Sequence, residues 1–445
     1  MGTDVDCRLS PSPRSTGARE FLVAGLIFAC VQFAHAQTAI PLTGEPFTAE
    51  FAGLDAQQNI KLKVGDRLRV LPAAELVRWG AWKELENGPQ IVLATGGSVR
   101  ADVLSLNETN LLIGDASDLG SVLWDESTLP VESICGLVWQ PPADALARDR
   151  LRLKLLSLPA GKDQLLLTAG ETLQGTIIGV PPAGRFTEKL TKEELAAADV
   201  FTLQVPKIEK PLVIAASKVL AVRFGAAEVQ QPTAPTSFAR VGFRDGSWLS
   251  AAKIATARDT FTVSLPGGGQ LVANNAYGDG ATDWFWKQVT LLQPFGDRVV
   301  YVSDLPPLGF KHLPFLSGQW NYGRDQNVLG GYLRTRDQVY LKGLGMFPAS
   351  RLAYDLGGKY RRLEGSLALD ARAEQKGSVT FRVLLEGAAS EWTAAYESPV
   401  IRGGDSPVEL SIDVKNAQRL AILVDFADRG DQCDYANWLD LRLLK

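Results

Sequence analysis

Residues 377–387, with the sequence GSVTFRVLLEG, indicate the fold class. Apolar side chains occupy every second position from Val379 to Leu385, which predicts a β-strand with one buried face. The same alternation runs from Val408 to Val414. Two such strands in the last third of the chain predict a β-sandwich, in which the apolar faces of two sheets pack together.

Alternation of apolar and polar residues also dominates the preceding part of the chain. Residues 201–205 (FTLQV) and 261–265 (FTVSL) are the clearest examples, and Gly, Pro, Asn and Asp separate such stretches. The one helix that the sequence predicts is short. Thr191 and Glu194 form a capping box before Leu195 to Ala198. The chain is therefore predicted to be all-β, with a short helix inserted near residues 191–198.

Residues 37–295 are predicted to contain degenerate repeats of small β modules. Each copy begins with an apolar strand, continues through a tight turn that contains Gly, and enters a second strand. The copies are found at residues 47–80, 91–139, 164–224 and from 241 onward. A spacing of very roughly 75 residues predicts tandem small β-barrels or sandwiches. Residues 230–237 (QQPTAPTS) have the composition of a linker.

The N-terminus has the pattern of a signal peptide. Residues 21–33 are an apolar run, three arginines precede it, and Ala34-His35-Ala36 forms an A-x-A cleavage pattern. Residues 1–36 are predicted to be removed, which makes the mature protein secreted or periplasmic. No later stretch has about 18 consecutive apolar residues, so no transmembrane segment is expected after cleavage.

Composition argues against several kinds of function. The net charge is −4 and no run of Lys or Arg would follow a phosphate backbone, so no nucleic-acid partner is expected. The four cysteines lack the close spacing of a zinc site or a redox motif. Cys135 and Cys433, which follow the cleavage point, are either bridged or separate buried thiols, and the second alternative is favoured. No cofactor is expected, and the sequence leaves open whether the sandwich binds calcium.

Catalytic motifs are also missing from the sequence. His312 is the only histidine after the cleavage point, which leaves little material for a metal site or a Ser-His-Asp triad. Two carboxylates from distant strands could still make a glycosidase. The repeat region, however, shows no alternation of strands and helices and predicts little room for a deep cleft. A non-catalytic protein is therefore expected, with a hydrolase as the less favoured alternative.

Aromatic residues provide the candidate binding site. Sugars present apolar C–H faces and hydroxyl groups, so their sites combine aromatic platforms with polar side chains that hydrogen-bond the hydroxyls. The C-terminal third supplies both kinds. For each aromatic residue the alternative is a packing role in the core. The candidate carbohydrate-binding residues are Trp320, Tyr322, Tyr332, Trp392 and Asn437.

Several ordered motifs in this third resemble one known family. They are KGLG at residues 342–345, SRLAYDL at 350–356, YRRLEG at 360–365, GSVTFRVLLEG at 377–387, and DYANWLD at 434–440. Their order and separations are similar to those of NPCBM, a carbohydrate-binding-type module first associated with glycoside hydrolase family 98. One departure concerns Met346-Phe347-Pro348, which stands where members of the family often carry a histidine.

The resemblance implies a non-catalytic, galactose-binding-like β-sandwich, or jelly roll, over residues 300–445. The leading hypothesis is an exported protein that binds a glycan or cell-surface polysaccharide. The alternative is a protein-interaction or envelope-assembly role, in which the repeats bind an envelope protein partner and the sandwich is a spacer.

Overall fold

The computed structural model describes residues 36–85, 88–115, 123–181, 191–192, 198–230, 236–275, 283–315, 318–387, 389–428 and 430–445. The predicted signal peptide, apart from Ala36, lies outside the described residues. So do most of the predicted helix at 191–198 and most of the predicted linker at 230–237. Residues from His35 to Lys445 form one unit by their contacts. Within the described ranges, no helix is long and apolar enough to cross a membrane.

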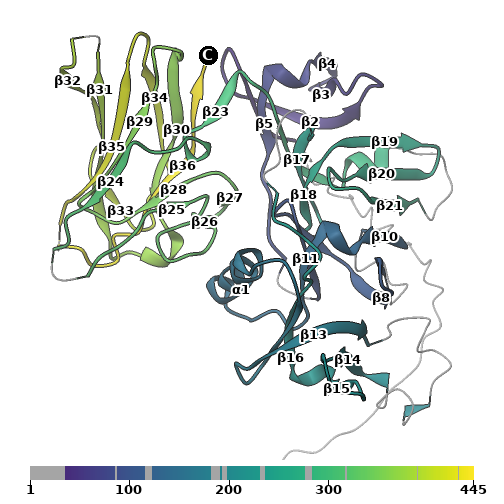
Figure 1. Ribbon diagram of the computed structural model, residues 1–445. Coiled ribbons are helices and arrows are strands. Elements are labelled where there is room, and N and C mark those ends of the chain that lie inside the picture. Colours follow the sequence, from purple (N-terminus) through teal and green to yellow (C-terminus); the bar gives the residue numbers. More distant parts are fainter. Residues whose placement is uncertain are drawn as a thin grey trace, which may run out of the picture. The chain divides into compact units, whose positions relative to one another are not determined.

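The first part of the chain consists of four units with a similar order of elements (Figure 1). The first unit has β1 (Gln37–Pro41), β2 (Phe47–Leu54), β3 (Ile60–Val64), β4 (Arg67–Leu71), a 3-10 turn (Ala73–Glu75) and β5 (Leu76–Gly80). The second has β6 (Gln90–Leu93), β7 (Ser98–Arg100), β8 (Asp102–Leu106), β9 (Asn110–Gly114), β10 (Ser127–Pro130), a 3-10 turn (Val131–Ser133) and β11 (Ile134–Val138).

The third and fourth units follow the same plan. The third has β12 (Asp163–Leu167), β13 (Thr172–Gly179), β14 (Val200–Gln204), β15 (Leu212–Ala215), a 3-10 turn (Ala216–Lys218) and β16 (Val219–Arg223). The fourth has β17 (Ala239–Phe243), β18 (Trp248–Ala251), β19 (Lys253–Ala257), β20 (Thr260–Ser264), β21 (Gln270–Asn274), helix α3 (Asp283–Trp286) and β22 (Val289–Pro294). In every unit the last strand pairs antiparallel with the first.

The hairpin that opens the last three units has one geometry. Gly96, Gly170 and Gly246 have φ of +87°, +95° and +85°. Each of their amides donates to the carbonyl three residues earlier, at 2.9, 3.0 and 3.2 Å. A residue with positive φ at this point completes a three-residue hairpin loop, and only glycine adopts that conformation without steric cost.

The four units share one sheet and one hydrophobic core. The pairs β5–β22, β7–β18 and β11–β16 join different units into a continuous run of strands. The strand order places the units in the sequence third, second, fourth, first. The strand orders are open, so none of the described sheets closes into a barrel. One cluster of buried residues extends from Ala39 to Leu292 across all four units.

Helix α1 (Ala145–Ser157) was not predicted from the sequence. It joins the second unit to the third, and the Asp144 carboxylate caps its first turn by accepting the Ala147 amide at 2.9 Å. Leu151 and Leu155 pack against β11, beside which α1 lies in Figure 1. Arg148, Asp149 and Arg152 are buried as well. Charged residues on several faces hide the apolar period that marks most surface helices.

The C-terminal part is a β-sandwich of two sheets (Figure 1). The sheet that we name the β36 sheet contains β23 (Val299–Tyr301), β25 (Gly323–Arg324), β28 (Gly343–Met346), β30 (Arg362–Leu369), β34 (Val408–Asp413) and β36 (Ala436–Leu444). The β31 sheet contains β24 (Gly309–His312), β29 (Ser350–Asp355), β31 (Ser378–Glu386), β32 (Trp392–Glu397), β33 (Ile401–Arg402) and β35 (Arg419–Phe426). Short 3-10 turns occupy Val302–Asp304 and Ala371–Ala373, and β26 (Leu333–Arg334) pairs with β27 (Val339–Tyr340).

Alternating side chains fill the space between the two sheets. Val379, Phe381 and Val383 of β31 are fully buried, and the ring of Phe381 meets Trp438 of β36 edge-on at 5.0 Å. The predicted strand at 377–387 is therefore a central strand of the sandwich. The all-β class predicted from the sequence is confirmed, including its C-terminal sandwich.

Candidate functional site

A groove of about 530 Å³ crosses the outer face of the β31 sheet. Side chains of β29, β31 and β35 alternate between the core and this face, so the groove is the solvent side of the sheet. Ten residues line it: Leu308, Gly309, Phe310, Lys311, Arg351, Ala353, Leu384, Trp392, Arg419 and Ala421. The volume lies within the range of roughly 300–1,000 Å³ that is usual for small-molecule sites.

Strand register produces the floor of the groove. Gly309 lies opposite Ala353, Ala353 opposite Ala421, and Ala421 opposite Leu384. These residues form one row across four strands, and three of the four have little or no side chain. Trp392 on the edge strand β32 is 43% exposed beside this row. A flat indole next to a shallow trough suits the apolar face of a sugar ring.

Three cations and no carboxylate line the groove. Lys311, Arg351 and Arg419 are all exposed. Arg419 has a partner, because its guanidinium lies 3.2 Å from the carboxylate of Glu386. Nothing in the local sequence distinguished these three residues from other exposed charges, so sequence reasoning missed them.

Two predicted site residues lie near one end of the sandwich. Trp320 is half-buried, and its ring stacks on Phe347 at 4.6 Å with an angle of 18° between the planes. The ring of Tyr322 packs against that of Phe310, a lining residue of the groove, at 5.2 Å, and Tyr322 itself does not line the groove. The backbone amide of Trp320 donates to Nδ1 of His312. The proton of this imidazole therefore sits on Nε2, which donates to the Pro348 carbonyl at 3.1 Å.

The other two predicted residues are buried. Tyr332 is 5% exposed, and its hydroxyl accepts a hydrogen bond from the Trp248 indole at 3.0 Å. Arg152 lies over its ring at 4.3 Å, and burial raises the pKa of the phenol to about 12. Asn437 is fully buried, and its amide donates to the Asp370 carboxylate at 3.0 Å. Neither side chain offers a surface to a sugar, so the groove includes only Trp392 of the five predicted residues.

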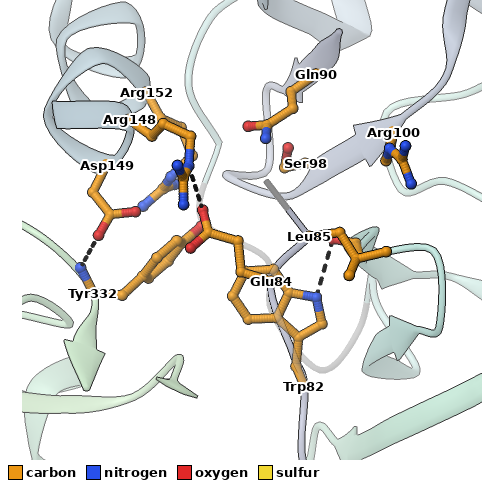
Figure 2. A pocket seen from close by; sticks show the side chains of 11 residues that line it. Trp82, Glu84, Leu85, Gln90, Ser98, Arg100, Arg148, Asp149, Arg152 and Tyr332 are labelled. Atoms are coloured by element: carbon orange, nitrogen blue, oxygen red, sulfur yellow. Dashed lines mark hydrogen bonds and ion pairs between the residues drawn. The ribbon is translucent and has the colours of Figure 1, made fainter. Parts of the chain in front are cut away.

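Tyr332 lines a second, much smaller pocket, shown in Figure 2. Its volume is about 10 Å³, which is space for one water molecule and too small for a sugar. Ion pairs close it. Arg334 lies 2.8 Å from Glu84 and 2.9 Å from Asp149, and Arg148 lies 3.3 Å from Glu84. We name these four residues the junction network, because they connect β26 of the sandwich with α1 and the segment that follows β5.

A family comparison identifies the domain that carries the groove. Residues 298–444 match the NPCBM/NEW2 domain. The resemblance proposed from the ordered motifs is thereby confirmed for the C-terminal domain. The match covers about a third of the chain, and the groove on the β31 sheet lies entirely within it.

Other proteins are similar over parts of the chain. A "Putative endo-alpha-N-acetylgalactosaminidase" of Renibacterium salmoninarum is 24% identical over 225 residues, which cover 45% of this chain and only 14% of that protein. A CBM51 module of a Clostridium perfringens enzyme, solved with methyl-galactose, is 20% identical over 33% of this chain and 99% of its own, with a TM-score of 0.28. The tandem CBM51 modules of a Streptococcus pneumoniae family 98 glycoside hydrolase are 10% identical over 80% and 87% of the two chains, with a TM-score of 0.29.

The described residues offer little to a metal ion. Within the described ranges, no group of three or more His, Cys, Asp or Glu side chains is placed to hold one. Cys135 and Cys433 are free thiols and do not form a bridge. Cys135 is fully buried, and this burial raises the pKa of its thiol, opposed by Arg223.

One carboxyl of the NPCBM domain gives a pH prediction. Asp434 is buried, its Oδ1 accepts the Ser378 amide at 2.7 Å, and its Oδ2 has no hydrogen-bond partner. Burial raises its pKa from 3.8 to about 7. The folded state therefore holds this proton more tightly than the unfolded state. The stability that this bound proton gives the folded state is fully present below about pH 4 and is lost as the pH rises through about 7.

Asp434→Asn is expected to raise Tm relative to the wild type at pH 8 and to change it little at pH 4. The amide stays neutral, and its oxygen can still accept the Ser378 amide. Thermal unfolding at both pH values measures the difference. Asp337→Asn, at an exposed position, is the matched control and should shift Tm equally little at both. A gain for Asp434→Asn that is the same at pH 4 and pH 8 would contradict the raised pKa.

Proposed function

We propose that this chain is an exported, non-catalytic protein that binds a glycan or cell-surface polysaccharide through its NPCBM domain. The groove on the β31 sheet carries this proposal, because it places the exposed indole of Trp392 beside a row of small side chains. The signal-peptide pattern of residues 21–36 supports export to the periplasm or the medium.

The lining of the groove supports the non-catalytic part of the proposal. Glycosidases need two carboxyl groups on either side of the scissile bond. The charged side chains that line this groove are Lys311, Arg351 and Arg419. A groove with this lining can hold a sugar but offers no general acid or nucleophile. A single module of this kind is expected to bind with a Kd between about 1 mM and 1 μM, or roughly 4 to 8 kcal/mol.

The first test is a glycan-array and polysaccharide pull-down screen of the whole chain, with and without calcium. For a glycan found in this way, Trp392→Ala should weaken binding by about tenfold or more. Stacking a sugar on the indole buries apolar surface, and this burial contributes roughly 1.5–3 kcal/mol to the free energy of binding. Isothermal titration gives the two Kd values, and circular dichroism checks that the variant is folded.

Trp320→Ala is the matched comparison, because Trp320 is also an accessible tryptophan of the same domain. Its Kd should stay within about twofold of the wild type, a difference below 0.5 kcal/mol. A loss with Trp320→Ala but not with Trp392→Ala would move the site to the cluster around Phe347. If the folded chain binds none of the glycans in the screen, the proposal is wrong.

A further inference from the structure

Two cations of the groove face each other without compensation. In the antiparallel register of β24 and β29, Lys311 lies directly opposite Arg351. Like charges at directly opposite positions of a sheet destabilise the pair of strands. In the part of the chain that the structure describes, no carboxylate lies within 4.0 Å of either side chain.

The third cation behaves differently. Arg419 of β35 lies opposite both Asp355 and Glu386 in the register, and it forms an ion pair with Glu386. The fold therefore neutralises a cation at one side of the groove and leaves two neighbouring cations unneutralised at the other. Lys311 and Arg351 are therefore available to an anionic group of a ligand.

The groove has the remaining features of a saccharide site. Its floor is made of small side chains, and Trp392 provides an aromatic wall on the edge strand. Arg and Lys bind carboxylate and sulfate groups through charge-assisted hydrogen bonds, and Arg can do so with two parallel bonds. In the strand order, β35 and β31 separate Arg351 on β29 from Trp392 on β32, a span of about 14 Å at the usual strand spacing. An acidic polysaccharide could cover this span, with an anionic group on one sugar for the cations and the C–H face of another sugar for the indole.

We propose that this groove binds an anionic polysaccharide, with a uronate or sulfate group between Lys311 and Arg351 and a sugar ring on Trp392. The inference rests on the proposed function, since it names the class of glycan that the same groove takes. Binding of the anion would also remove the repulsion between Lys311 and Arg351.

The test uses the whole chain with polygalacturonate and dextran sulfate as anionic probes, and with galactan and dextran as their neutral counterparts. We compare the wild type with Lys311→Gln/Arg351→Gln and with a control of equal charge change, Lys359→Gln/Arg361→Gln, whose side chains are exposed outside the groove. Titration at low salt and at 0.5 M NaCl separates electrostatic binding from stacking.

We expect at least one anionic probe to bind the wild type. Affinity should fall by about tenfold or more in Lys311→Gln/Arg351→Gln, because two charge-assisted hydrogen-bonding groups are lost. The control variant should stay within about twofold of the wild type. Without ligand, Lys311→Gln/Arg351→Gln should have a higher Tm at low salt, since the repulsion is gone.

Other outcomes overturn the inference in distinguishable ways. If a neutral glycan binds, is lost in Trp392→Ala and is unaffected by Lys311→Gln/Arg351→Gln, the proposed function stands and the anionic class is wrong. An equal loss in both double variants means a general charge effect and overturns it. A lower Tm in Lys311→Gln/Arg351→Gln without ligand would also overturn the inference. Binding of a single-stranded DNA oligonucleotide as tightly as polygalacturonate would overturn it as well. If no glycan binds the folded chain, the proposed function itself fails.

Discussion

Asp149→Ala is expected to destabilise the protein by about 3–5 kcal/mol, because it removes one partner from a buried ion pair. Asp149 is 2% exposed, pairs with Arg334 at 2.9 Å and accepts the Tyr332 amide at 2.8 Å. Without it, Glu84 is the remaining carboxylate partner of Arg334 among the described residues, and the Tyr332 amide loses its acceptor. Thermal unfolding followed by tryptophan fluorescence measures the loss, since Trp82 lies in the same pocket.

Two further variants make this prediction specific. Asp337→Ala, at an exposed position, should change the free energy of unfolding by less than about 0.5 kcal/mol. Asp149→Leu/Arg334→Met removes both charges together and should lose less than Asp149→Ala, because no unpaired charge is left buried. If Asp149→Ala is no worse than Asp337→Ala, the junction network does not stabilise the protein.

Arg223→Ala is expected to cost at least about 3 kcal/mol for a different reason. Arg223 is 1% exposed, and its guanidinium donates to backbone carbonyl groups rather than to a carboxylate. The acceptors are the carbonyls of Leu158, Cys135, Phe224 and Ala227. Each buried carbonyl left without a donor costs about 1–3 kcal/mol. Urea unfolding of the variant at pH 7 measures the loss.

Arg223→Lys should recover only part of the stability, because an ammonium has three donors where the planar guanidinium has five. Lys253→Met, at an exposed position of β19, is the control for removing a positive charge and should be nearly neutral. Full stability of Arg223→Lys would show that the charge matters rather than the fork of donors. Wild-type stability of Arg223→Ala would contradict the prediction outright.

The candidate site shows how far local sequence patterns extend. Trp392 was a candidate because aromatic residues have a recognisable chemistry for sugars, and the structure adds that its indole is exposed. Tyr332 was a candidate as an aromatic residue and Asn437 as a hydrogen-bonding amide, yet both are buried, Tyr332 at the junction pocket and Asn437 beside Asp370. Burial depends on which segments pack over a residue, and the residue type alone does not reveal this.

The sequence by itself determined the all-β class and the family of residues 298–444, because alternation along a strand and the order of motifs are local properties. Helix α1 was not predicted from the sequence. Arg148 and Asp149 are buried in it, at positions where a surface helix usually carries apolar residues. Only the tertiary structure decided the order of the four units in their common sheet, and only it decided the groove. Both depend on strand register between distant segments. That register places Lys311 opposite Arg351 and Ala421 beside Leu384, and no pattern along the chain records it.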